Sequence, residues 1–411
     1  MTTKINNEHK KVYVPNLRFP EFHGEWEKCK LGDYGKVVTG NTPPTKDIEN
    51  YENGTYLWAS PADLGTIKSI TETKTMLSAQ GFSKTRTLPK GSVLVTCIGS
   101  TIGKAGMATK EMSTNQQINS IVVNDNNDNE FVYYAIQSAF PRYLSSIAVQ
   151  AVPIISKSAF ELLPNNRPYL QEQKKIGRFL SMLDERIATQ NKIIDKLQSL
   201  IKGLEDNLLD NPLWEKTYLR SFMQFFSTNS LSWEQLSYKE GAIRNLHYGL
   251  IHGFQTRGIN SASLPMIKNE AIPKQYTLCQ VGDVAFADAS EDTGEIAKSV
   301  EFVDTIEGDT ICGLHTIHGR DIKNRTVVGF KGFAFNSRYF HNQIKRLAQG
   351  TKVFSITANN LSSCYVYLPD LETQKAIVKL LKAYEAQLIV SRKTLKQYEK
   401  QKQYLLRQMF I

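Results

Sequence analysis

The sequence predicts a mixed α/β protein in which two globular domains are joined by two long helices that form an antiparallel coiled coil. The length of 411 residues is the first observation, because domains usually span about 100–200 residues. The second is an internal repeat, in which a segment from the middle of the chain recurs near its end. The third is a regular spacing of apolar residues after each copy. Together they predict two halves related by an internal pseudo-twofold repeat.

The repeated segment reads PYLQEQKKIGRFL at residues 168–180 and PDLETQKAIVKLL at residues 369–381. Pro, Leu, Gln, Lys, Ile and Leu recur at a fixed offset, and the glutamines are Gln173 and Gln374. Each copy opens a stretch whose length and periodicity are typical of a long helix. The repeat therefore predicts that each globular domain is followed by the same helical element.

Apolar residues in both helices alternate in steps of three and four, which is the a/d pattern of a coiled coil. Gln190 and Ser391 interrupt the two patterns at the same position, as polar residues that fix the register of a coiled coil do. The alternative is that each helix is amphipathic and packs only on its own domain. The predicted seam comprises Leu180, Leu183, Ile187, Ile194, Leu197, Ile201, Leu204, Leu381, Tyr384, Leu388, Leu395, Tyr398 and Leu405.

Domain boundaries follow from these helices. Asp210-Asn211-Pro212 ends the first helix, because proline cannot continue a helix and Asn and Asp favour turns. The expected order is a lead-in, a first domain, a central helix, a second domain and a C-terminal helix, at residues 1–20, 21–168, 169–211, 212–368 and 369–411.

The two globular domains mix short strands and turns with helical segments, which we expect at residues 130–144 and 335–347. Two local matches relate the domains. Trp26-Glu27 matches Trp233-Glu234, and residues 90–93 match residues 281–284, each opening a short apolar run. These matches predict that the second domain repeats the first.

Composition excludes several classes of protein. The hydrophobic content is 41%, which is ordinary for a folded chain, and no apolar stretch is long enough to span a bilayer. Residues 1–11 are polar and do not resemble a secretion signal. Five cysteines, scattered and never spaced as CxxC, fit a reducing compartment. We therefore expect a cytoplasmic protein without a membrane partner.

The net charge of +10 indicates a polyanionic partner, because cationic proteins bind nucleic acids by releasing counterions. Most of this excess lies in residues 371–411, while the two globular blocks are nearly neutral. Charge alone therefore favours nucleic-acid binding only weakly.

Gly99-Ser100-Thr101-Ile102-Gly103-Lys104 is the nearest approach to an enzyme motif. A phosphate-binding P-loop needs one more residue in the loop and a Ser or Thr after the lysine, where this chain has Ala105. Two interpretations remain. The turn presents Ser100, Thr101 and Lys104 to DNA, or it is a hairpin turn with a solvated lysine.

Cys312, His315 and His318 have spacings found in metal sites, but no second close pair accompanies them, and we predict no metal site. His247 and His252 could complete a zinc site only through the fold. Recognition of a polar ligand or burial in the core is the favoured interpretation.

The acidic residues Asp288, Glu291, Asp292 and Glu295 fit a divalent-ion site, a solvated loop or a reader of cytosine amino groups. The sequence also lacks an Asn/Asp-Pro-Pro-aromatic segment, as used to hold a flipped base, and a glycine-rich cofactor fingerprint. The chain is therefore not expected to be an enzyme.

In the order of these elements, the chain resembles the DNA-specificity subunits of type I restriction–modification systems over nearly its whole length. In that family two target-recognition domains are separated by long helices that form an antiparallel coiled coil. The glutamines that open both helices match the segment after each recognition domain. The other similar motifs lie at residues 15–27, 39–43, 98–104, 115–117, 247–249 and 313–317.

The resemblance implies that each domain reads one half of a bipartite site in double-stranded DNA. It also implies two methyltransferase subunits, with adenine-specific activity, and restriction subunits that act as helicase and nuclease. S-adenosylmethionine, ATP and Mg would then belong to those partners, with none in this chain. The rival hypothesis is a stand-alone DNA-binding scaffold, followed by a nucleotide-hydrolysing P-loop protein.

Exposed basic residues of the second helix, Lys393, Lys396, Lys400 and Arg407, are expected either to contact an acidic partner or to act as a solubilising face. The predicted DNA-binding residues are Thr39, Asn41, Thr42, Ser100, Thr101, Lys104, Asn115, Gln116, Gln117, His247, Tyr248, Asp288, Ser290, His315, Thr316 and Arg320.

Overall fold

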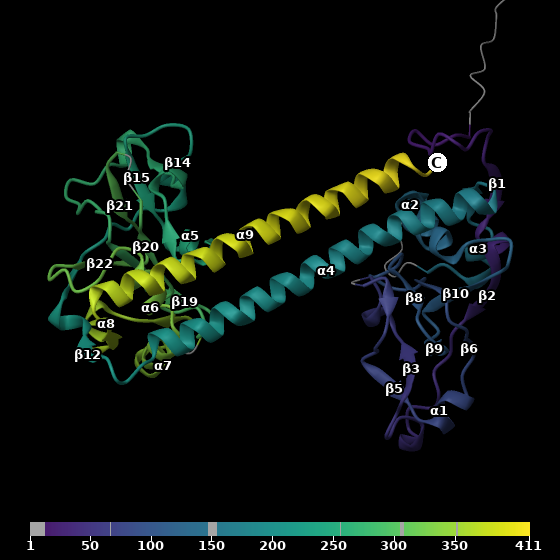
Figure 1. Cartoon of the computed structure of the whole chain (residues 1–411), viewed down its shortest axis with the longest axis horizontal. Coiled ribbons are helices and arrows are strands. Elements are labelled where there is room, and N and C mark those ends of the chain that lie inside the picture. The colour runs from purple at the N-terminus through teal and green to yellow at the C-terminus, as the bar shows by residue number, and fades with distance from the viewer. Residues whose placement is uncertain (1–12, 66, 147–153, 255, 305–307, 351) are drawn as a thin grey trace, which may run out of the picture. The chain divides into compact units, whose positions relative to one another are not determined.

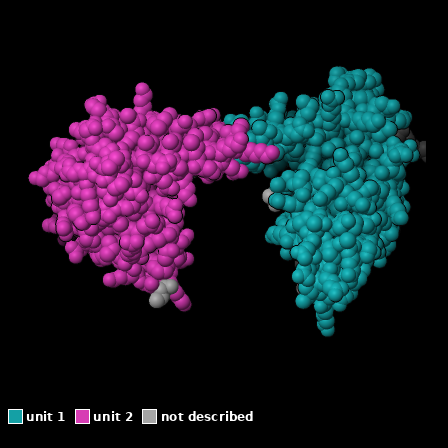
Figure 2. All heavy atoms as spheres, turned by 60° about the horizontal axis from the view of Figure 1, so that its bottom comes forward, with its two compact units in different colours: residues 1–191, 394–411 teal, residues 192–393 magenta. Residues whose placement is uncertain are grey.

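The computed structural model describes residues 13–65, 67–146, 154–254, 256–304, 308–350 and 352–411 (Figure 1). It divides into two compact units, which Figure 2 distinguishes by colour. Unit 1 contains residues 1–191 and 394–411, and unit 2 contains residues 192–393. Each unit therefore combines one globular domain with parts of both long helices.

Two sheets and a strand pair build the domain of unit 1. The five-stranded sheet has the order β2-β10-β7-β8-β4, at Gly35–Thr39, Ile118–Val123, Val93–Thr96, Ala105–Ala108 and Ser69–Ile70. The four-stranded sheet has the order β5-β3-β9-β6, at Thr75–Leu77, Tyr56–Ala59, Met112–Thr114 and Thr87–Leu88. The strand pair joins β1, Glu27–Lys30, to β11, Pro164–Arg167.

The five-stranded sheet of unit 1 has apolar side chains on both faces. In β7, Val93 and Val95 belong to the core that includes α2, whereas Leu94 belongs to a second core with residues of the four-stranded sheet. This division follows from the strand, whose successive side chains point to opposite faces. The helices of the domain are α2, Asn129–Ser146, and the two short helices α1, Ala79–Ser83, and α3, Lys157–Glu161.

Unit 2 also has one five-stranded and one four-stranded sheet. Its five-stranded sheet has the order β13-β22-β18-β20-β16, at Met223–Phe226, Thr316–Asp321, Val284–Ala287, Ser299–Phe302 and Gly258–Ile259. Its four-stranded sheet has the order β14-β17-β15-β21, at Leu236–Ser237, Met266–Ile267, Ile243–Leu246 and Thr310–Cys312. Two strand pairs join β12 to β24 and β19 to β23, at Glu215–Tyr218, Tyr365–Leu368, Ala289–Ser290 and Phe354–Ser355.

The helices of the second domain are α5 to α8, at Tyr248–Gly253, Phe330–Ala334, Arg338–Leu347 and Ala358–Ser363. Ser337 begins α7 by accepting a hydrogen bond from the backbone N–H of Phe340, and Thr357 begins α8 in the same way. In β18, Val284 and Phe286 face one core, and Ala285 and Ala287 face the other. The helical segment expected at residues 130–144 corresponds to α2. The segment expected at residues 335–347 begins three residues before α7 and ends with it.

The five-stranded sheets of the two domains share one topology, whereas the four-stranded sheets differ, with the parallel pair β3-β9 central in unit 1 and the parallel pair β15-β21 at an edge in unit 2. In each five-stranded sheet the first four strands pair antiparallel and the last pair is parallel. Gly91 and Gly282 both have positive φ and precede the equivalent strands β7 and β18, as the match between residues 90–93 and 281–284 predicts.

The match of Trp26 with Trp233 is wrong. Trp26 is buried immediately before β1, whose equivalent β12 follows Trp214, while Trp233 is an exposed residue of a 3₁₀ turn.

The long helices are α4, Leu170–Leu209, and α9, Leu371–Gln408. In unit 1 the beginning of α4 packs on the end of α9, where Leu183 and Leu405 share a core and Lys402 lies 2.7 Å from Asp184. In unit 2 the end of α4 shares a core with the beginning of α9, which includes Leu381. The helices therefore pack as an antiparallel, coiled-coil-like pair, and the predicted seam residues are all buried or half-buried.

The repeated glutamines explain why the sequence repeat exists. Gln173 accepts a hydrogen bond from Asp128 N at 3.0 Å and donates to Pro168 O at 2.9 Å. Gln374 accepts from Val327 N at 3.0 Å and donates to Pro369 O at 3.0 Å. Each buried amide thus ties the start of a long helix to its own domain.

Among the described residues, no helix combines the length and the apolar character that a membrane crossing requires.

Candidate functional site

The turn between β7 and β8 is a glycine hairpin. Gly103 has φ of +90°, and a Cβ at this position would lie 2.5 Å from the ring of Phe140, so only glycine fits. Ser100 and Lys104 are exposed, and Thr101 is half-buried. The turn therefore presents two hydroxyls and one ammonium group to a ligand.

The element after this turn is the strand β8, Ala105–Ala108, and not a helix. A phosphate-binding loop uses the backbone N–H groups at a helix N-terminus. The geometry therefore fits a hairpin turn and gives no support to the nucleotide-binding interpretation.

Three segments that lie apart in the sequence meet at this turn. Thr42 Oγ1 is hydrogen-bonded to Gln116 Oε1, and Cys97 N donates to Gln117 O at 2.7 Å. A Cβ on Gly99 would lie 3.9 Å from Gln117 Nε2. Residues 39–42, 97–104 and 115–117 thus form one surface at the same end of the five-stranded sheet, which we call surface 1.

Several predicted residues of surface 1 have internal partners. Asn115 is nearly buried and exchanges hydrogen bonds with Gln117, at 2.9 Å to its backbone N and 3.1 Å to its side chain. Thr39 Oγ1 donates to Asn119 Oδ1 at 2.7 Å, and Asn41 Nδ2 donates to Lys84 O at 2.9 Å. These side chains hold the shape of the loops, while Gln116 is exposed.

Arg86 adjoins residues 39–41, and we add it to surface 1, although the sequence analysis did not identify it. Its Nη1 donates to Thr39 O at 2.8 Å, its backbone N donates to Asn41 Oδ1 at 2.8 Å, and its side chain is exposed. Only the folded arrangement brings it to residues 39–41. It adds a guanidinium group that suits phosphate or guanine.

Aromatic rings gather around the start of α5 in unit 2. His247 Nδ1 accepts a hydrogen bond from Gly249 N at 3.2 Å, and its ring centroid lies 4.4 Å from that of Trp233. Burial lowers the pKa of His247, and the nearby His315 lowers it further. Tyr248 is half-buried and meets the ring of His315 edge-on at 5.3 Å. Trp233, which is 46% exposed, extends this cluster to the surface.

His315 and Asp288 form the polar part of the same region. His315 has φ of +53°, and its Nδ1 lies 3.0 Å from Asp288 Oδ1. Asp288 N also donates to His315 O at 3.0 Å. Half of the His315 side chain is exposed. Ser290, which follows Asp288 closely in sequence, is half-buried. We call residues 247–248, 288–290 and 315, together with Trp233, surface 2.

Three predicted DNA-binding residues also have internal partners, and their role in DNA binding stays a prediction. His247 is 3% exposed and caps α5. Thr316 is also buried, and its hydroxyl donates to Gly313 O at 2.6 Å. Arg320 donates through Nε and Nη2 to both oxygens of Asp283, at 2.8 and 2.7 Å. These bonds hold the three side chains in place within the domain.

Of the acidic residues after β18, Asp288 and Glu295 pair with basic groups. Glu295 Oε2 lies 2.8 Å from Lys298 Nζ and 3.2 Å from His252 Nδ1. Burial opposes ionisation of Glu295, but the bonds from Lys298 and His252 outweigh it and lower its pKa. Within the described residues these carboxylates form no cluster that could hold a metal ion.

Surfaces 1 and 2 use equivalent loops of the two domains. Cys97 N donates to Gln117 O at 2.7 Å in unit 1, and Asp288 N donates to His315 O at 3.0 Å in unit 2. In each unit the first residue of this pair also accepts from an isoleucine N, that of Ile155 or Ile356. The backbone is therefore the same, while the side chains that it presents differ.

The spacing of Cys312, His315 and His318 does not describe the cluster that forms. Cys312 and His318 come together with Cys279, whereas His315 pairs with Asp288. Cys279 lies far from the other two in sequence, and no local pattern links them.

A sequence model of the type I restriction modification DNA specificity domain matches residues 23–199 and 264–400. The chain is 25% identical to the type I restriction enzyme MjaVIII specificity subunit of Methanocaldococcus jannaschii, with 94% of each chain covered. It is 30% identical to the MjaIX specificity subunit of the same organism over 42% of each chain.

Two solved structures have the same fold. The S subunit of the type I restriction–modification system of M. genitalium aligns with a TM-score of 0.61, at 16% identity, over 97% of this chain and 99% of that one. A chain from a study of complex assembly and conformational transition of the type I R–M system aligns with a TM-score of 0.56, at 15% identity, over 93% and 96%.

Proposed function

The chain belongs to the family of type I restriction enzyme specificity subunits, and we propose that it recognises a bipartite sequence in double-stranded DNA, with one half-site read by each domain. Surface 1 would read one half-site and surface 2 the other. The family is non-catalytic, so the chain directs the chemistry of partner subunits.

The equivalence of the two surfaces is the observation that carries this proposal. The same backbone hydrogen bonds position the loops that hold Gln117 and His315. Protein scaffolds that keep a fixed frame and vary its loops are suited to recognition. Two copies of one frame with different side chains are what a protein needs to read two different half-sites.

The side chains suit different contacts with DNA. In surface 1, exposed Gln116 can bond adenine in the major groove, and Ser100, Thr101, Lys104 and Arg86 can contact phosphates or base edges. In surface 2, Asp288 and Ser290 can accept hydrogen bonds from base amino groups, and Tyr248, His315 and Trp233 offer aromatic rings. The two surfaces therefore favour different bases.

Methylation and cleavage would belong to partners, namely two adenine-specific methyltransferase subunits and restriction subunits with helicase and nuclease activity. These would supply S-adenosylmethionine, ATP and Mg. Lys393, Lys396, Lys400 and Arg407 are exposed on α9 and offer a basic face to them. The purified chain alone is expected neither to methylate DNA nor to hydrolyse ATP.

Domain exchange tests the proposal. The chain is co-expressed with a methyltransferase subunit that assembles with it, and the methylated sequence is read from the host genome. Replacing residues 213–367 by the corresponding part of another specificity subunit should change one half-site and leave the other. A change in both half-sites would show that the two surfaces form a single reader and would overturn the proposal.

Point variants localise the two readers within the intact chain. Gln116→Ala should relax specificity in the half-site that survives the exchange, and Asp288→Ala should relax the other. Asp125→Ala, at an exposed residue after β10 and thus at the other end of that strand from Gln116, is the matched control and should leave both half-sites unchanged.

A further inference from the structure

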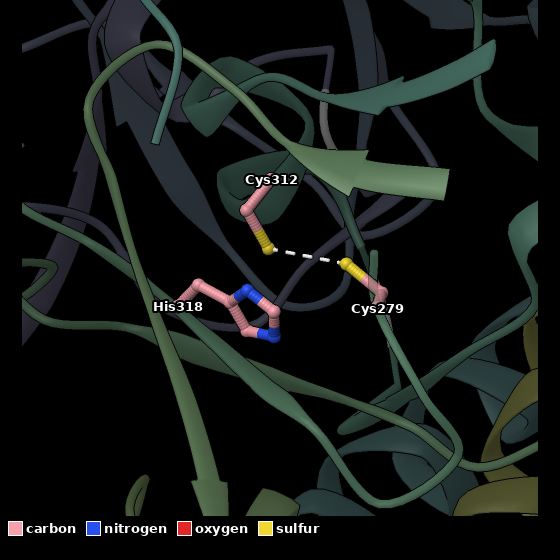
Figure 3. A group of neighbouring side chains, drawn as sticks. All are labelled: Cys279, Cys312 and His318. Carbon is pink, nitrogen blue, oxygen red and sulfur yellow. Dashed lines mark hydrogen bonds between the residues drawn. The ribbon is translucent and has the colours of Figure 1, made fainter. Parts of the chain in front are cut away.

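Three buried side chains of unit 2 converge on one point. Cys279 lies before β18, Cys312 ends β21, and His318 lies within β22. Their exposed fractions are 6%, 2% and 1%. β21 and β22 belong to different sheets, so the cluster lies where the four-stranded and five-stranded sheets meet. Figure 3 shows the two sulfurs facing each other with the imidazole beside them.

The distances between the donor atoms fit a single ion. The two sulfurs are 3.6 Å apart, and the three donor atoms lie within 4.8 Å of one another. Zinc binds sulfur at about 2.3 Å with tetrahedral angles, which places two sulfur ligands roughly 3.8 Å apart. The spacing of the cysteines therefore matches a shared ion.

A buried carboxylate orients the histidine. His318 Nε2 lies 2.7 Å from Asp283 Oδ2, and Arg320 binds both oxygens of Asp283. Burial opposes ionisation of Asp283, but the bonds from Arg320 and His318 outweigh it and lower its pKa. With Nε2 bonded to Asp283, the Nδ1 edge of the ring faces the sulfurs (Figure 3). Histidines that bind metals commonly donate their other N–H to a carboxylate in this way.

We propose that Cys279, Cys312 and His318 bind one zinc ion. Two thiolates and an imidazole suit zinc, whereas calcium and magnesium require oxygen ligands. Three protein ligands leave the fourth tetrahedral position for water, as in other Cys₂His sites.

The charges of the site balance when zinc is bound. Zinc binds cysteine as the thiolate, so each of the two thiols gives up its proton when the ion binds. Binding releases these two protons to solvent, and two Zn–S bonds and one Zn–N bond form. Two thiolates then neutralise the zinc ion, and Arg320 neutralises Asp283. No unpaired charge is left buried.

The ion would fix a turn of surface 2. Cys312 and His318 flank residues 313–317, which include His315 in its left-handed conformation. Zinc would join both ends of this segment to the loop before β18. The effect on DNA recognition rests on the proposed function, but metal binding itself does not.

Metal analysis of the full-length chain is the first test. The chain is purified with a reducing agent and without chelators, and its metal content is measured by inductively coupled plasma mass spectrometry. We expect about one zinc ion per chain, and a loss to background in Cys279→Ser and Cys312→Ser. Cys364→Ser is the matched control, because Cys364 is a buried cysteine of unit 2 outside the cluster, and it should retain the ion.

Cobalt provides a second measurement that needs no variant to fold. Co²⁺ added to the metal-free wild-type chain should produce the near-ultraviolet charge-transfer absorption of thiolate ligands.

Asp283→Asn should weaken zinc affinity about 10–100-fold, because the histidine loses its orienting partner. A wild-type chain that shows neither zinc nor cobalt absorption would overturn the proposal, and so would a disulfide between Cys279 and Cys312 in the isolated chain. DNA is absent from these assays, so their outcome is independent of the proposed function.

Discussion

Glu385 is a carboxylate that the fold of unit 2 holds in an unfavourable environment. It lies on α9 and accepts a hydrogen bond from Arg257 N at 3.2 Å. Glu205 on α4 is buried, and its Oε1 lies 3.7 Å from Arg257 Nε. Burial raises the pKa of Glu385 to about 7, with Glu205 adding to the effect and Arg257 and Lys382 opposing it. Glu385→Gln is therefore expected to stabilise the protein at neutral and alkaline pH.

The magnitude follows from the shift in pKa. The ordinary value is 4.5, and each unit corresponds to about 1.4 kcal/mol, so ionised Glu385 costs up to about 3 kcal/mol of folding free energy. Below pH 4.5 the carboxyl is protonated in both folded and unfolded chains, and this cost is absent. It grows as the pH rises from 4.5 to 7 and is complete above pH 7. Glutamine has no such dependence and keeps the acceptor for Arg257 N.

Thermal unfolding at pH 5 and pH 8 measures the effect. The variant should unfold at a temperature roughly 6–12 °C higher than wild type at pH 8, and at nearly the same temperature at pH 5. Glu399→Gln, at an exposed position of the same helix, is the control and should have little effect at either pH. Equal shifts at both pH values, or a variant less stable at pH 8, would refute the reasoning.

Five further substitutions test the fold and the DNA surface. Gln374→Ala should lower the free energy of unfolding by about 2–4 kcal/mol in urea denaturation, because it leaves buried backbone groups without partners, and Gln173→Ala should have a similar effect. Leu197→Ala in the helix seam should cost about 2–3 kcal/mol, whereas Leu200→Ala at an exposed position should change stability by less than about 0.5 kcal/mol. Lys104→Ala should weaken DNA binding by the assembled complex to all sequences alike and reduce the salt slope by about one, whereas a change in sequence preference would show that Lys104 reads bases.

The long helices could be predicted from the sequence because their signals are local and periodic. The apolar spacing and the repeated glutamine are visible along the chain, and α4 and α9 begin within a few residues of the expected positions. The sheets were less accessible. β3 pairs in parallel with β9, and β15 with β21, between residues far apart in sequence, which no short pattern specifies. Strand order therefore came from the structure.

The candidate sites show the same limit. Ser100 and Lys104 lie on a glycine turn, and the sequence indicated that turn correctly. Arg320 was expected to bind DNA, but its partner Asp283 becomes its neighbour only when β18 and β22 pair. Cys279 joins Cys312 for a similar reason, because Cys279 N donates to Thr310 O across the fold. Residues that meet through strand pairing cannot be recognised from their spacing.

The division of the chain into units has a consequence for its synthesis. Unit 2 is a continuous insertion, whereas unit 1 needs residues 394–411 to complete its core. Phe410 packs against Phe131 with ring centroids 5.4 Å apart, and against Trp26 at 6.1 Å. On the ribosome the second domain can therefore finish folding first, while the first waits for the last residues to emerge. A nonsense mutation anywhere in unit 2 would therefore also remove Leu405, Met409 and Phe410 from the core of the first domain.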